Sequence, residues 1–271
     1  PITWLARGVT TGTTITISYS ADGGETWTQL TNGIPTMAGQ WLWDSTLSAP
    51  SVQGKLRIEG VDGSSAENER FFSVRNTAFS YYINDGNPTN DIYCTNVGNN
   101  TNSGLSGSAP MADLNALLAK YDLESGDTVY IDTGIYRDVD PWRITQADSA
   151  GNLGLPPVVF QGSTNALYST VVDRAGGSTG IQVDYAIGVL LRNITISNTV
   201  GQAVTFNDCF DAGAEWITIG VGNIGFQLSG GEQLRVAHSL VYDTAQGVML
   251  RNWNQNTNMV YPLLEHNVFW E

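Results

Sequence analysis

Four ionisable residues in the second half of the chain precede a similar apolar segment at the same offset. They are Arg192, Glu215, His238 and His266. If these segments stack, the side chains form one column along an outer edge, with Glu215 between Arg192 and His238. An imidazole beside a carboxylate is a common means of moving a proton near neutral pH, so the column is a candidate catalytic site for an anionic sugar. The favoured alternative is a solvated edge of alternating charges, worth about 0–1 kcal/mol per exposed pair.

Aromatic residues in loops form a second candidate set, because a flat ring can stack on the face of a sugar. Trp142 follows the segment 126–136, and Arg251, Trp253 and Tyr261 belong to the Asn-rich segment 251–262. Binding sites commonly lie on the loops of a rigid scaffold. The alternative, with equal weight, is that these rings only pack the loops onto that scaffold.

Segment 84–91 is rich in side-chain oxygens and includes Asp85 and Asp91. Calcium prefers such ligands, but the spacing matches no calcium-loop pattern, and this favours a polar turn. We therefore expect no cofactor, with calcium as the one ion that the loop would take.

Short segments recur at a nearly constant interval in the same half of the chain. Those that begin at residues 180, 203, 225 and 247 each read small, apolar, variable, apolar, which gives steps of 23, 22 and 22 residues. Such a period indicates a solenoid, and each repeat is too short for a strand and a helix. The pattern predicts a right-handed parallel β-helix with one coil per repeat and coils about 4.8 Å apart.

The same register assigns residues to faces of the coil. One inward column is expected to contain Val183, Phe206, Leu228 and Leu250, and another Ile194, Ile217, Leu240 and Val268. Two neighbouring outward rows are expected to contain Gln182, Thr205, Gln227 and Met249, and Asp184, Asn207, Ser229 and Arg251. The amides, hydroxyl and thioether of the first row are poor bases and poor metal ligands. The second row contains one acid, Asp184, and one base, Arg251, too far apart along the stack to cooperate, so neither row predicts catalysis.

Residues 1–76 alternate as short antiparallel strands that are separated by Gly, Pro, Asn and Asp, a pattern typical of a β-sandwich. Ser20 to Trp27 matches the Asp-box pattern S-x-D-x-G-x-T-W, in which the carboxylate fixes a hairpin turn. Sialidase propellers carry several such boxes. A single box disfavours that fold and indicates a rigid turn.

A helix of about residues 109–121 is expected before the first coil. Ser108 is a good N-cap, and Leu114, Leu117, Leu118 and Tyr121 form one apolar stripe. A lone amphipathic helix at this point is suited to cap the open end of a solenoid. The fold class is therefore all-β, with a short N-terminal capping α-helix on the β-helix of residues 77–271.

Two family resemblances support this division. Residues 1–76 resemble bacterial extracellular immunoglobulin-like modules through "ITW", "TITISYSADGGETW" and "WLW", without the strand that usually comes first. The run from Tyr81 to Tyr136 is similar to the entry segment of the pectate-lyase-like superfamily. That resemblance implies polysaccharide lyases, alginate epimerases or non-catalytic surface proteins. The W-x-D-H, R-x-P-x-x-R, G-H-G and D-P-H-D patterns of its enzymes are absent from the sequence.

The amino-acid composition limits the classes of partner that the protein can bind. The chain of 271 residues has 12 Lys and Arg against 26 Asp and Glu, a net charge of −14, which disfavours nucleic acid. No apolar run is long enough to span a bilayer. Acidic chains with few Lys are typical of exported proteins, so an extracellular or cell-surface location is expected. Cys94 and Cys209 fit either a disulfide or two buried thiols.

Three functions remain open on these grounds. The favoured one is a non-catalytic structural or adhesive module of a larger surface or filament-forming protein, because both ends read as interior points of a longer chain. Its partners would be further domains of that polypeptide, or other copies of itself. The alternatives are a polysaccharide lyase or epimerase acting on an acidic glycan, and a module that binds extracellular polysaccharide without chemistry.

Overall fold

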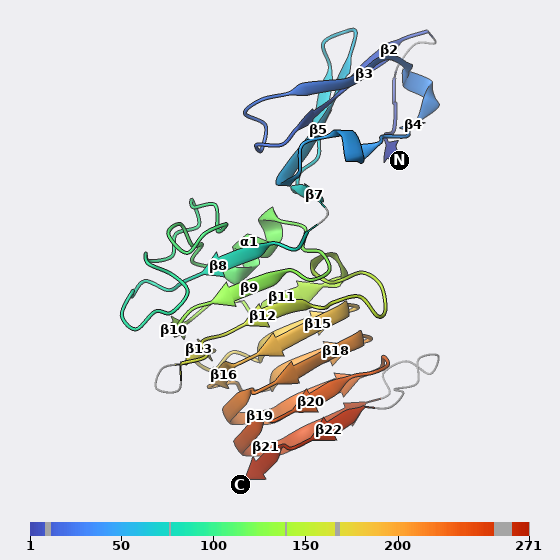
Figure 1. The fold of residues 1–271 in the computed structure, drawn as a ribbon. Helices are drawn as coiled ribbons and strands as arrows, with labels where there is room; N and C mark the ends of the chain where they lie inside the picture. Colours follow the sequence, from blue (N-terminus) through green and yellow to red (C-terminus); the bar gives the residue numbers. More distant parts are fainter. Residues whose placement is uncertain (9–11, 76, 139, 166–168, 252–261, 271) are drawn as a thin grey trace. The chain divides into compact units, whose positions relative to one another are not determined.

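The computed structural model describes residues 1–271 except 9–11, 76, 139, 166–168, 252–261 and 271 (Figure 1). The chain forms two compact units. The first contains residues 1–77 and 119–122, and the second contains residues 78–118 and 123–271. No helix among the described residues is long and apolar enough to cross a membrane.

The first unit is built from antiparallel strands. One sheet pairs β1 with β4, and the other has the order β3-β2-β5-β6, with β7 also paired to β5. Their bounds, with two short 3-10 helices, are β1 Ile2–Thr3, β2 Thr14–Ser20, β3 Thr28–Pro35, η1 Thr36–Ala38, β4 Gln40–Trp41, η2 Ser45–Leu47, β5 Ser51–Gly60, β6 Ser65–Glu67 and β7 Phe72–Val74. Its core gathers around Ile2, Ile15 and Ile17. An immunoglobulin-like topology for this unit stays a prediction.

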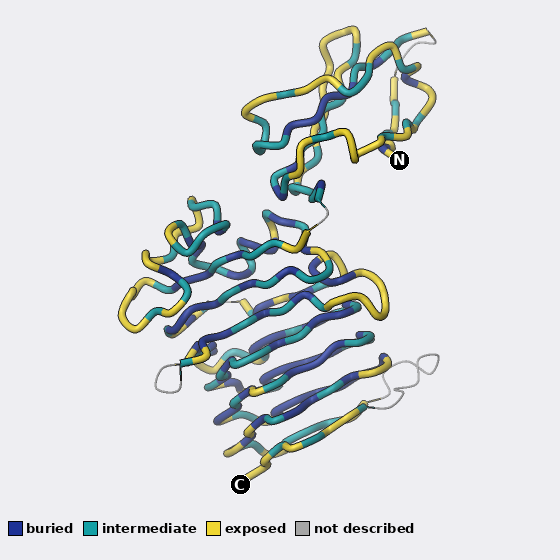
Figure 2. The backbone as a smooth tube through the Cα atoms, in the orientation of Figure 1, coloured by how far each residue is buried: buried dark blue, intermediate teal, exposed yellow. Residues whose placement is uncertain are grey.

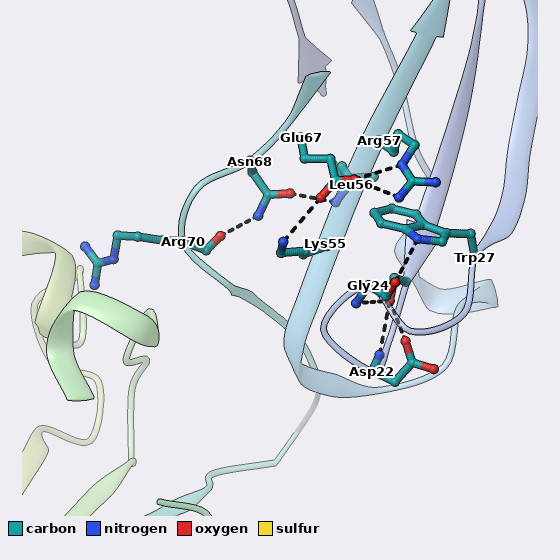
Figure 3. Close-up of polar contacts among 10 residues, drawn as sticks. Asp22, Gly24, Trp27, Lys55, Leu56, Arg57, Glu67, Asn68 and Arg70 are labelled. Carbon is teal, nitrogen blue, oxygen red and sulfur yellow. Dashed lines mark hydrogen bonds and ion pairs between the residues drawn. The ribbon is translucent and has the colours of Figure 1, made fainter. Parts of the chain in front are cut away.

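The Asp-box forms the turn between β2 and β3 (Figure 3). Asp22 accepts a hydrogen bond from the Thr26 backbone N–H at 2.8 Å and another from the Ser20 hydroxyl at 2.7 Å. The Trp27 indole N–H donates to the Gly24 carbonyl at 3.0 Å, and Gly24 has a φ of 104° that suits glycine. These bonds, led by those from Thr26, hold the pKa of the Asp22 carboxyl well below its usual value.

Replacing Asp22 with Ala should loosen this turn, because the donors of Thr26 and Ser20 lose their acceptor. The depressed pKa means that the carboxylate stabilises the folded unit above the unfolded pKa of about 3.9, and that this contribution is lost as the pH falls below it. We expect faster hydrogen exchange across residues 14–35 in Asp22→Ala at pH 7. Glu59→Ala on β5 is the control. Equal exchange in both variants would show that the carboxylate does not hold the turn.

The second unit is a parallel β-helix-like fold, called the β-helix below, in which each coil contributes one strand to each of three faces (Figure 1). The groove face contains β11 Trp142–Thr145, β14 Thr179–Asp184, β17 Gln202–Asn207 and the second halves of β19 Thr218–Ser229 and β21 Leu240–Arg251. The second face contains β8 Ser80–Ile83, β9 Thr128–Ile131, β12 Val158–Gln161, β15 Ile187–Arg192, β18 Phe210–Glu215, β20 Arg235–Ala237 and β22 Leu263–Glu265. The third face contains β10 Gly134–Tyr136, β13 Thr170–Asp173, β16 Ile194–Ser197, β23 Val268–Trp270 and the first halves of β19 and β21.

Buried residues recur along the strands of successive coils of the β-helix (Figure 2). Val183, Phe206 and Leu228 lie in register and are at most 1 % exposed. Leu250 pairs in register with Leu228 and so continues this column, although its side chain is 52 % exposed. The predicted parallel fold and the register of the groove face are therefore confirmed for β14, β17, β19 and β21.

The second predicted column is wrong by one residue from position 239 onward. Thr218 pairs with Leu240, and Leu240 with Val268, so both leucine and valine fall on outward positions, at 37 % and 58 % exposure. Ser239 takes the inward place instead. Its hydroxyl accepts from the Ile217 N–H at 3.2 Å and donates to the Ala237 carbonyl at 2.9 Å. A buried serine is tolerated here because its polar group is satisfied.

The capping helix is shorter than predicted. α1 spans Leu114–Lys120, and its first turn is capped by Asp113, whose carboxylate accepts from the Asn115 N–H at 2.7 Å. Ser108 is not the cap, because residues 107–109 form a turn and Met111 pairs with Ile83 at the edge of β8 before the helix begins. The predicted apolar stripe of α1 is buried. The 3-10 helix η3, Gln146–Asp148, follows β11.

Candidate functional site

The groove face carries an open groove of about 390 Å³ that crosses three successive coils. Its floor is the outward row formed by Gln182, Thr205 and Gln227, which lie in register on β14, β17 and β19. A second outward row, two residues later on each strand, contains Asp184, Asn207 and Ser229. The pairing of the strands thus places one amide, hydroxyl or carboxylate of each row at every one of these three coils.

Hydrogen bonds fix the orientation of these polar groups. Asp184 accepts from the Gln182 amide at 2.7 Å through one carboxylate oxygen and from the Asn207 amide at 2.7 Å through the other. The Gln227 amide donates to the Ser229 hydroxyl at 3.1 Å. The groove therefore presents ordered hydrogen-bonding groups, and Asp184 is held by neutral amides rather than by a cation.

Two atoms of the groove floor have no hydrogen-bond partner among the described residues. They are the Thr205 hydroxyl oxygen and the Gln227 amide oxygen, on side chains that are 5 % and 7 % exposed. A buried polar atom without a partner costs about 1–3 kcal/mol. A ligand hydroxyl that reached these atoms after a small side-chain rotation would remove that cost.

A cation lies towards each end of the groove face. Arg143 precedes Gln182 in the outward row and lines an adjoining hollow of about 600 Å³ together with Asp184 and Tyr185. Arg251 follows Ser229 at the end of β21, and its Nε lies 2.9 Å from the Met249 sulfur. The ionisable side chains that line the groove between them are Asp184, Asp208 and Tyr185.

The predicted column of Arg192, Glu215, His238 and His266 is not one column. Arg192 pairs in register with Glu215, but Glu215 pairs with Ala237. The two histidines lie one position later and stack with Trp216 instead. The reason is the same one-residue slip that moves Leu240 outward, because the predicted alignment followed apolar letters and ignored the inward serine.

A charge network replaces that column on the second face. Glu215 accepts from Arg192 Nε at 2.9 Å and is also bonded to Arg235, which in turn donates to Glu265 at 2.7 Å. The bond from Arg235, aided by the charge of that guanidinium and of the neighbouring imidazoles, keeps the pKa of Glu265 below its usual value. Positive and negative groups alternate, so this network is suited to stabilising the stack of coils rather than to proton transfer.

The structure describes only two of the four residues predicted to bind a glycan through the loops. Trp142 is 1 % exposed, its indole N–H donates to Asp138 at 2.5 Å and its ring packs edge-on against Tyr136, so it is a core residue and not a sugar-binding one. Arg251 is exposed at the end of β21. Trp253 and Tyr261 lie outside the described residues.

The calcium candidates accept hydrogen bonds from protein groups, except that one oxygen of Asp91 has no partner among the described residues. Asp85 accepts from the backbone N–H of Asn87 at 2.7 Å and of Ile135 at 3.1 Å. Asp91 accepts from the Asn84 amide at 2.6 Å, and burial raises the pKa of its carboxyl. Within the described part of the chain, no group of three or more acidic, His or Cys residues has the geometry of a metal site.

The cysteines are two buried free thiols in this structure. Burial raises the pKa of Cys209 to about 12 and that of Cys94 further. A thiol with a raised pKa is a poor nucleophile at neutral pH, so neither cysteine is a candidate for covalent chemistry.

Two residues of these side-chain clusters were not identified from the sequence, Arg235 in the charge network and Trp216 in the ring stack. Arg235 links Glu215 to Glu265, and the alternation of charge across Arg192, Glu215, Arg235 and Glu265 was the signal that could have found it. Trp216 occupies a corner with a φ of 57°, and only the stacking with His238 across the coils singles it out. The amide row of the groove face was placed correctly, but it was considered only as a source of bases and metal ligands.

Comparison with known proteins supports the fold of the second unit. No protein-family model matches the chain, and no curated protein matches its sequence. Among solved structures, a rhamnogalacturonan lyase is similar, with a TM-score of 0.52 and 15% sequence identity over 71% of this chain and 52% of that one. The chain thus spans about half the length of that lyase. At this identity the likeness shows a parallel β-helix-like fold and no more.

The charge network predicts a measurable role for Glu215. Its side chain is 13% exposed and lies between two guanidiniums, so Glu215→Gln should lower the free energy of unfolding by about 1–2 kcal/mol. Urea denaturation measures this, with the exposed Glu232→Gln as control. Added salt should shrink the loss, because it screens the two arginines left facing each other. No loss at low salt would contradict a stabilising role for the network.

Proposed function

We propose that the β-helix binds a polysaccharide along its groove face. The observation that carries this proposal is the double row of amide, hydroxyl and carboxylate groups that repeats over consecutive coils of an open groove. Sugar hydroxyls both donate and accept hydrogen bonds, and these side chains offer both functions. The Thr205 hydroxyl oxygen and the Gln227 amide oxygen add two acceptors that have no partner within the described part of the chain.

The charges of the groove favour an uncharged sugar at its centre. Asp184 and Asp208 are the charged side chains that line it, and a uronate carboxylate beside them would be repelled. The net charge of −14 acts in the same direction. Acidic sugars, if bound, would have to lie near Arg143 or Arg251 at the two ends.

Binding without turnover agrees with the role that we favour from the sequence. In that proposal the chain is an extracellular or cell-surface module of a larger adhesive or structural protein, with an immunoglobulin-like first unit. The groove would then attach that protein to a glycan. Extracellular location, further domains and self-association are parts of this proposal that rest on sequence alone.

A second candidate, a polysaccharide lyase, is favoured by two specific observations. The similar solved structure is named a rhamnogalacturonan lyase. The hollow beside the groove also brings together Arg143, Tyr185 and Asp184, and an arginine or a tyrosine can serve as the base that removes a proton next to a uronate carboxylate. The histidine candidates of the sequence lie at another corner of the coil.

The binding proposal predicts opposite effects on stability and on affinity. Thr205→Val replaces an unpaired buried hydroxyl with a methyl group, so the free energy of unfolding should stay equal or rise. Together with Gln227→Leu, it should weaken polysaccharide binding about tenfold. Affinity electrophoresis in gels that contain neutral or acidic polysaccharides measures binding. Thr195→Val, on the third face, is the matched control. Unchanged retardation of the double variant in every gel that retards the wild type would exclude the groove.

The lyase candidate makes a separate prediction. We expect no ultraviolet-absorbing unsaturated product when the folded protein is incubated with rhamnogalacturonan, pectate or alginate, with or without calcium. Product that forms with the wild type and disappears in Arg143→Ala would replace binding by catalysis as the function of this face. His238→Ala serves as control, because His238 lies outside the hollow.

A further inference from the structure

The corner between the second and third faces presents one outward residue per coil. In successive coils these are Asn193, Trp216, His238 and His266, with φ values of 53°, 57°, 50° and 53°. The backbone N–H of Trp216 donates to the carbonyl of Ala237 at 3.1 Å, and the neighbouring corners repeat this bond. The left-handed conformation and the bond to the next coil fix the direction in which each of these side chains leaves the chain.

The three rings of this corner stack on one another. The Trp216 and His238 rings lie 4.6 Å apart at an interplanar angle of 11°, and the His238 and His266 rings lie 4.9 Å apart at 5°. These separations match the usual distance between paired strands. The stack therefore holds the indole of Trp216 in one orientation, so a ligand would not have to order it.

His238 covers one face of the indole, and the corner positions on its other side carry no ring. The preceding corner positions carry the short side chain of Asn193 and, one coil earlier, Gly162. Trp216 remains 56% exposed, and no second ring stacks on it among the residues that the structure describes. A large aromatic ring that is rigidly held and exposed on one face is a typical anchor for a ligand.

The ion pairs at the register positions next to this corner carry no net charge. Arg192, which directly precedes Asn193, is paired with Glu215, and Arg235 is paired with Glu215 and Glu265. The two positive and two negative side chains balance. A ligand at Trp216 would therefore meet an apolar surface with a neutral hydrogen-bonding rim, which is the complement of an uncharged sugar ring.

We propose that the indole face of Trp216 opposite His238 binds the apolar face of an uncharged pyranose residue, with Asn193 and Arg192 as hydrogen-bonding partners of its hydroxyls. A pyranose has a C–H face that packs on an aromatic ring and a rim of hydroxyls that needs polar partners. This site is separate from the groove, because the corner at Trp216 lies between the two faces that do not contain the groove. It does not depend on the function proposed above.

Fluorine NMR of protein labelled with 5-fluorotryptophan tests the site directly. The resonance of Trp216 is assigned by its absence from Trp216→Tyr. We expect this resonance to shift saturably on titration with cellopentaose or xylopentaose. Trp216→Gly is compatible with the left-handed φ of this position and should lower the association constant at this site about tenfold. Saturation-transfer NMR measures this constant on a chain whose groove carries Thr205→Val and Gln227→Leu, so that groove binding does not contribute.

The controls separate this site from the groove. Thr195→Val should leave the shift of Trp216 unchanged. A shift that vanishes in Thr205→Val would arise from groove binding and would overturn the proposal, as would a folded wild-type protein whose Trp216 resonance does not move with either sugar. If circular dichroism shows that Trp216→Gly is unfolded, the wild-type titration alone decides.

Discussion

Hydrogen bonding between successive coils is the constraint on which the second unit depends. It fixes a nearly constant distance between equivalent residues, and it turns a sequence period of about 22 residues into columns of side chains. The same pairing produces the inward column of Val183, Phe206 and Leu228, the amide row of the groove and the ring stack at the corner. A column is therefore a property of the register, and a single-residue slip changes which face a side chain occupies.

The sequence was sufficient to predict the parallel coil and most of its groove face. Residues from Gly180 to Leu228 keep small and apolar residues at fixed offsets, so their register could be read directly. The prediction failed at Ser239, where a hydroxyl bonded to two backbone groups takes an inward place and Leu240 turns outward. Apolar residues at the surface are ordinary, and only the backbone bonds of Ser239 distinguish the two registers.

Site residues were harder to predict than the fold. Arg192, Glu215 and the histidines precede similar apolar segments at one offset, which predicts a single column, and the structure divides them between a charge network and a ring stack. Trp142 looked like a loop residue, but Asp138 satisfies its indole N–H and makes its burial favourable. The hydrogen-bonding pattern of Gln182, Asp184 and Asn207 depends on side-chain directions across two coils, which no local sequence pattern contains.

The groove grows with the coil. Its two rows receive one new pair of outward side chains each time the chain completes a turn, so its length is set by the number of repeats and not by any special loop. Duplication of one repeat of about 22 residues in the gene would lengthen the groove by one strand spacing while leaving its cross-section unchanged. Selection could in this way match the protein to longer or shorter stretches of a linear polymer without redesigning a single contact.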